Sequence, residues 1–168
     1  MKRFNWKKIS IGLAVVFLLA QFIRPTKNLS GDETNSIHKK FALPADVKTT
    51  LEVACNDCHS NKTVYPWYAE IQPVAWWLQK HVNHGNSHLN FSTLGAKPAW
   101  LQNHKMEEVQ EMIEKNKMPL NSYTWVHRDA VLSEAQKSAI IAWTKTVRDS
   151  LTARFPADSL KMPPRKKG

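Results

Sequence analysis

Hydrophobic positions recur with the period of an amphipathic α-helix over four stretches of the chain. The predicted helices cover residues 46–55, 74–84, 104–116 and 134–153. The apolar stripes of the last two, which we expect to be buried, consist of Met106, Val109, Met112, Ile113, Ile140, Trp143, Val147 and Leu151. We find no convincing β-strand pattern and no internal repeat. The sequence therefore predicts a small all-α domain with long loops.

Residues with local backbone chemistry mark the expected helix ends. Asp46 is placed to cap the first helix, and Pro73 suits the first turn of the second, which Gly85 is expected to stop. Ser133 and Gln136 have the spacing of a capping box before the last helix.

The N-terminus combines a basic segment with an apolar run. Residues 1–8 carry four basic side chains, and the run that follows extends from Ile9 to Ile23. About 15 residues is short for a membrane span, which needs roughly 17–25, and no small-x-small cleavage site follows the run. We favour a signal anchor over a cleaved signal peptide for residues 1–23, with a buried helix as a third interpretation. The basic flank then stays in the cytoplasm and the rest of the chain lies outside.

Composition divides the remaining chain into three parts. Residues 24–45 are polar and irregular and are expected to form a tether. Residues 46–154 hold the helical pattern and form the predicted domain. Residues 155–168 are rich in Pro and Lys and are expected to be a disordered basic tail.

The only two cysteines of the chain lie in the motif Cys55-Asn56-Asp57-Cys58-His59. In a C-x-x-C-H motif the two thiols point the same way and can each bond one vinyl group of a porphyrin, while the histidine comes under the iron. The sequence thus predicts one covalent haem c, bound through Cys55, Cys58 and His59. The alternatives are a redox dithiol, which is typical of a βαβ setting; a zinc site, which needs two more ligands; and a disulfide.

A sixth iron ligand has several candidates. Met118 precedes Pro119 after the third predicted helix, and a thioether ligand there favours electron transfer. His81, with His84 and His88 at helical spacings, is the alternative distal ligand. Met106 and Met112 belong to the apolar stripe.

Aromatic residues follow the motif closely in a chain that has seven tryptophans. We expect Tyr65, Trp67 and Trp77 to pack against the haem, and an ordinary hydrophobic core is the alternative interpretation.

The net charge of +10 and the pI near 9.7 allow an acidic partner, an anionic lipid or a nucleic acid. No nucleic-acid motif is present, so we expect no nucleic-acid binding. A redox partner with an acidic surface is the expected partner, in addition to the membrane.

The run ACNDCHSNKTVYPWYAEIQPVAWWLQKHVNHGNSHLNF, residues 54–91, closely resembles the haem-binding domain family of exported bacterial proteins. QFIRPTKN (21–28) and NKMPLNSYTWVHRDAVLSEAQKSAIIAW (116–143) are also similar to that family. The resemblance implies a cytochrome-c-like haem domain behind an N-terminal membrane anchor. It also implies that Met118-Pro119 corresponds to the distal Met loop, although relatives often have a second proline where this chain has Leu120.

These features together predict a membrane-anchored monohaem c-type cytochrome that transfers single electrons in the periplasm and is not an enzyme. The expected location is the inner membrane, with a secreted or periplasmic protein as the alternative if the signal is cleaved. Alternative functions are a haem-based sensor or small-ligand-binding protein and a peroxidase-like haem enzyme, both of which need an open iron position.

Overall fold

The computed structural model describes residues 5–164, and every regular element in this range is a helix. The prediction of an all-α fold is therefore confirmed. The longer helices are α1 (Trp6–Ala20), α3 (Ala45–Ala54), α5 (Val74–His88), α7 (Ala99–Glu114) and α9 (Glu134–Arg154). The short elements are α2 (Ile37–Lys40), α4 (Asn56–His59), η1 (Trp67–Glu70), α6 (Phe91–Leu94), α8 (Asn121–Thr124), η2 (Arg128–Ala130) and η3 (Ala157–Leu160).

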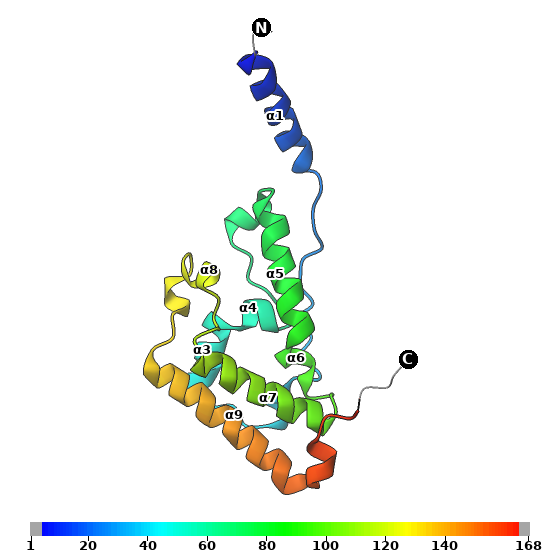
Figure 1. The fold of residues 1–168 in the computed structure, drawn as a ribbon, viewed down its shortest axis with the longest axis vertical. Helices are drawn as coiled ribbons and strands as arrows, with labels where there is room; N and C mark the ends of the chain where they lie inside the picture. Colours follow the sequence, from blue (N-terminus) through cyan, green and yellow to red (C-terminus); the bar gives the residue numbers. More distant parts are fainter. Residues whose placement is uncertain (1–4, 165–168) are drawn as a thin grey trace.

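Helices α7 and α9 pack along each other at the end of the molecule furthest from α1 (Figure 1). Helix α3 lies against α9, α4 packs on α3, and α5 packs on α4, so α3 and α4 together connect the α7–α9 pair to α5. Helix α1 projects from the opposite end, next to the start of α5 (Figure 1).

The two predicted stripes occupy different environments. Ile140, Trp143, Val147 and Leu151 of α9 are all buried, as predicted. On α7, Met106 and Ile113 are also buried in the core. Their neighbours on the same stripe, Val109 and Met112, are only partly buried and line a cavity.

Helix α5 begins at Val74 after Pro73, and α9 begins at Glu134 after Ser133, as predicted. The capping box of α9 has both of its bonds, between Ser133 and Gln136. Helix α7 begins at Ala99, five residues earlier than predicted. The apolar pattern does not reveal this start, because the first turn buries the polar Gln102 completely. Helix α3 begins after Pro44, so Asp46 lies in the first turn and is not the cap.

The segment expected to be a tether packs against the domain over much of its length. Ile37 and Phe41 are buried in the core. The Asn28 side chain donates to the backbone carbonyl of Ser60 and to Thr63 Oγ1, at 2.8 and 3.0 Å. Residues 24–45 therefore belong to the folded unit, and their polar composition concealed these long-range contacts.

His38 of this segment packs its ring against Phe91 and Trp143, with centroids 5.6 Å away in both cases. Burial lowers the pKa of His38, so below the unfolded-state pKa of about 6.5 the unfolded chain binds more protons. The free energy of unfolding should decrease as the pH is lowered below that value, by at most about 1.4 kcal/mol per pH unit for this group. We expect the His38→Phe variant to lose less stability than the parent between neutral pH and pH of about 5 in urea titrations. An identical loss in both proteins would contradict this role.

The two chain ends differ from their predictions. Helix α1 forms and buries none of its residues, but within residues 5–164 no helix has the length and apolar character needed to cross a bilayer. In the expected disordered tail, η3 packs beside α7 and Leu160 contacts the core. The basic cluster at residues 165–167 lies outside the described residues.

Candidate haem site

The motif residues lie on a single turn that joins α3 to α4. Cys55 ends α3, and its carbonyl accepts hydrogen bonds from the backbone N–H groups of Cys58 and His59, at 3.1 and 3.0 Å. Both cysteines are free thiols. The turn thus presents two thiols and one imidazole from five consecutive residues.

Burial keeps both thiols protonated at neutral pH. It raises the pKa of Cys55 to about 12 and that of Cys58 to about 11. A redox dithiol depends on a thiol whose pKa is lowered into the neutral range. The environment of these cysteines therefore disfavours the dithiol alternative.

The His59 ring is held in one orientation by the end of α5. Its Nδ1 lies 3.0 Å from the Leu89 carbonyl oxygen, which only accepts, so Nδ1 carries the proton and donates. Burial lowers the pKa of His59 and favours the neutral ring. The Nε2 lone pair of such a ring is available to a metal, and a backbone carbonyl on Nδ1 is a common partner of a ligating histidine.

A cavity of about 230 Å³ lies beside this turn, between α3, α5, α7 and α9. Its lining includes Cys55, His59 and Met118. Its apolar walls are Leu51, Leu89, Phe91, Val109, Met112, Ile113 and Ile140. A narrower pocket of about 60 Å³ adjoins it and is lined by both cysteines, His59 and Met118. The structure thus brings the thiols, the imidazole and a thioether together around one apolar space, which fits a haem.

Met118 reaches the cavity because the chain reverses after α7. Asn116 adopts a left-handed backbone with φ of 52°. The N–H of Asn116 bonds the Ile113 carbonyl at 3.0 Å, and that of Lys117 bonds the Met112 carbonyl at 2.8 Å. These are the two bonds of a Schellman motif, which asparagine at this position favours. Asn116 was not among the predicted site residues, although its type and place after an apolar stripe are a recognisable signal.

Tyr123 ties the segment that follows Met118 to the cysteine motif. Its hydroxyl donates to Asp57 Oδ2 at 2.8 Å, and Asp57 Oδ1 accepts from the Val64 N–H at 2.8 Å. Burial and the Asp57 carboxylate raise the pKa of Tyr123 well above its usual value, so the phenol stays a donor. Sequence reasoning did not identify either residue, because the bond joins positions 66 residues apart.

Gly85 sits inside α5 and does not stop it, because the helix continues to His88. A Cβ at Gly85 would lie 2.6 Å from the Cys58 carbonyl oxygen and 2.9 Å from Cys58 Cβ. The glycine therefore permits the close approach of α5 to the motif turn. The sequence predicts a helix end at Gly85 because glycine more often ends a helix than permits a close contact between two elements.

Gly85→Ala is expected to destabilise the domain despite the better helix propensity of alanine. The contact is with backbone, so α5 must shift, and such overpacking costs about 1–3 kcal/mol, against a gain of about 1 kcal/mol from propensity. Urea titration should show a lower midpoint for this variant. The matched control is Gly12→Ala, since Gly12 has no atom within 4 Å of its added Cβ. Equal midpoints for Gly85→Ala and the parent would contradict the close-packing role.

The histidines of α5 line the same spaces without forming a metal cluster. His81 lies at the narrow pocket, with Nδ1 2.8 Å from the Trp77 carbonyl oxygen and its ring 4.3 Å from the Trp77 ring. His84 and His88 are exposed at the rim of the larger cavity, with rings 4.2 Å apart. Within residues 5–164 no group of three or more His, Cys, Asp or Glu side chains is arranged to hold a metal ion.

The predicted aromatic wall is not where the sequence placed it. Tyr65 points away from both pockets toward the N-terminal segment, where its hydroxyl accepts from the Asn28 N–H and donates to Gln79 Oε1. Trp67 is 77% exposed, and Trp77 is half exposed beside His81. The cavity wall is formed instead by aliphatic and methionine side chains from α3, α7 and α9, with Phe91.

Comparison with known proteins identifies a family. The model of the haem-binding domain family matches residues 15–146. No curated protein and no solved structure matches the chain. The matched range covers most of the sequence and contains α3 to α8, the cysteine motif and Met118. The chain therefore belongs to the haem-binding domain family.

Proposed function

We propose that the protein is a monohaem c-type cytochrome that transfers single electrons outside the cytoplasm and is held at the membrane by α1. The observation that carries the proposal is the shared lining of one apolar space by two protonated thiols, a neutral imidazole and a methionine. A covalent, six-coordinate haem c requires these four groups, and the thiols and the imidazole are in the protonation state that the haem needs.

In this proposal each side chain has a distinct role. The S–H of Cys55 and that of Cys58 would each add across one vinyl C=C bond, which gives two thioethers and consumes no oxidant. His59 Nε2 would bind the iron, and the Leu89 carbonyl holds the ring in place. Met118 Sδ would be the second protein ligand of the iron, held by the reversal at Asn116.

A bound haem supplies a one-electron couple at the iron. The apolar walls keep water from the iron and stabilise the less charged, reduced state, and a methionine ligand acts in the same direction by raising the potential. The residues of the cavity thus favour electron transfer over ligand binding.

Membrane attachment is proposed from the surface of α1. All of its residues are exposed or half-exposed, and its apolar side chains include Leu13, Val16 and Phe17, which are 67, 64 and 49% exposed. A helix that is apolar on all sides is stable in a nonpolar surrounding. We further propose a periplasmic haem domain and an acidic redox partner, which suits the net charge of +10.

The reaction of the reduced holoprotein with carbon monoxide tests this function against its alternatives. We expect a low-spin optical spectrum that carbon monoxide does not change, because Met118 fills the sixth position. A high-spin spectrum and rapid binding of carbon monoxide would contradict electron transfer and favour a sensor or a peroxidase-like enzyme, for which His81 or His84 of the narrow pocket are candidate acid–base groups.

A further inference from the structure

Beyond α1, the exposed tryptophans of the described chain lie on η1, on the first turn of α5 and directly after α8. They are Trp67, Trp76, Trp77 and Trp125, with exposed fractions of 77, 38, 50 and 74%. We call this surface the aromatic end. Val64 and Val126, 72 and 54% exposed, extend it. Exposed apolar patches on soluble domains often mark sites of protein or membrane interaction, so the aromatic end requires an explanation.

The aromatic end is continuous with a cleft of about 450 Å³ between η1, α5 and α8. Val64, Trp77, Trp125 and Val126 all line this cleft. Tyr68 and His127 join its two sides, with 3.3 Å between Tyr68 Oη and His127 Nε2. Residues from distant parts of the sequence are therefore held together in one apolar surface.

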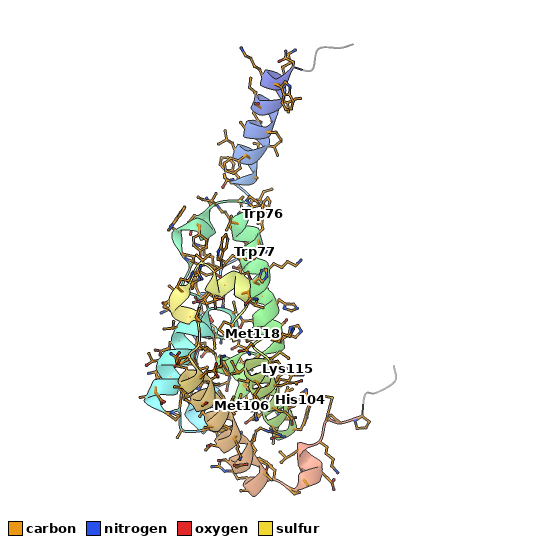
Figure 2. The ribbon with its side chains drawn as sticks, turned by 60° about the vertical axis from the view of Figure 1, so that its left-hand side comes forward. Trp76, Trp77, His104, Met106, Lys115 and Met118 are labelled. Carbon is orange, nitrogen blue, oxygen red and sulfur yellow. The ribbon has the colours of Figure 1, made fainter. Side chains whose placement is uncertain are left out.

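Helix α1 leaves the domain at this same end and is fixed there. Gln72 is fully buried; its N–H donates to Gln21 Oε1 and its side-chain amide to the Ile23 carbonyl, both at 2.9 Å. The indole N–H of Trp76 donates to the same Ile23 carbonyl at 2.9 Å. Figure 2 shows Trp76 and Trp77 at the base of α1. The end of α1 is thus bonded directly to the surface that carries the tryptophans.

A second connection follows immediately along the chain. The Arg24 guanidinium donates to the backbone carbonyl and the carboxylate of Glu70, at 2.7 and 3.0 Å, and Lys27 pairs with the same carboxylate. Glu70 ends η1, next to Trp67. These contacts orient the aromatic end toward the side from which α1 leaves the domain.

We propose that the aromatic end docks on the lipid bilayer, with its tryptophans in the headgroup region and the domain standing upright beneath α1. This inference rests on the proposed attachment through α1. Tryptophan prefers the membrane–water interface, because an apolar ring can be buried there while the indole N–H stays hydrated. The cleft shares Cys58 and His81 with the pocket beside the haem site, so docking holds that edge of the site close to the bilayer.

Lipid titration of the full-length holoprotein tests the docking. The parent chain for this titration carries Leu13→Gln and Phe17→Gln in α1, which lowers its partition constant into a range that can be measured. The vesicles consist of phosphatidylcholine and phosphatidylglycerol. Adding Trp67→Ser and Trp125→Ser should lower the partition constant by about tenfold or more. The matched control adds Phe155→Ser and Met162→Ser, which are exposed apolar residues at the opposite end of the molecule, and should stay within about twofold of the parent. Equal melting temperatures establish that all three chains are folded.

The outcomes separate docking from attachment. If the parent binds and the Trp67→Ser, Trp125→Ser chain binds equally well, the docking is refuted and attachment through α1 stands. If the unmodified wild type does not bind vesicles at all, both are refuted. A wild type that is dimeric without lipid, and becomes monomeric when Trp67 and Trp125 are replaced, would identify the aromatic end as an interface between copies and would also overturn the proposal.

Discussion

Replacing Cys55 and Cys58 together by alanine is expected to abolish covalent haem attachment completely. Both thiols line the narrow pocket that His59 also lines. The chain has no other cysteine. Haem bound by the double variant should be extracted by acidified acetone, whereas haem of the wild type should stay with the precipitated protein. The physical reason is that each thioether is a covalent bond that acid does not break, while axial ligation ends when the protein unfolds.

The two single variants are the internal controls for this result. Each retains one thiol and should keep the haem covalently attached through a single thioether, with a shifted absorption band from the remaining vinyl group. Covalent haem in the double variant would contradict the assignment of these cysteines. Loss of all haem from one single variant would instead indicate that the two thiols are not equivalent in the attachment.

Replacing Met118 by alanine is expected to open the iron position that we propose Met118 to fill, so that external ligands can bind there. The weak near-infrared band of a methionine–iron bond should disappear, and carbon monoxide should bind the reduced form. The midpoint potential should fall by on the order of 0.1–0.3 V, a fraction of the roughly 0.8 V over which axial ligands tune haem proteins.

Met112 provides the matched control, because it lines the same cavity from α7. Met112→Leu conserves volume and should leave both the near-infrared band and the potential close to those of the wild type. A band that persists in Met118→Ala but is lost in Met112→Leu would assign the sixth position to Met112. A band in neither variant nor in the wild type would favour a histidine such as His81.

The sequence predicted those parts of the fold that depend on local periodicity. The stripe of α9 and its capping box were correct because both are set within one helix. The buried Gln102 concealed the start of α7, since a polar residue breaks the apolar pattern even where its amide bonds the Gly95 and Lys97 carbonyls. The packing of Ile37 in the supposed tether depends on distant partners and has no local signal.

The site shows the same division between local and long-range information. Cys55, Cys58 and His59 are adjacent in sequence and are brought together by a single turn. The role of Gly85 depends on how closely two helices approach, which no sequence pattern encodes. Tyr65 lies near the motif in sequence but points elsewhere, because nearness along a loop does not determine the direction of a side chain.

The intact mass of the denatured full-length protein tests the central claim most directly. The chain is expressed with its N-terminus intact in cells that attach haem to exported proteins, then purified and unfolded in acid before mass spectrometry. We predict a mass equal to that of the polypeptide plus one haem, with no population at two haems. A mass equal to the polypeptide alone, from a preparation that is coloured before unfolding, would show that the haem is not covalently bound and would contradict the account.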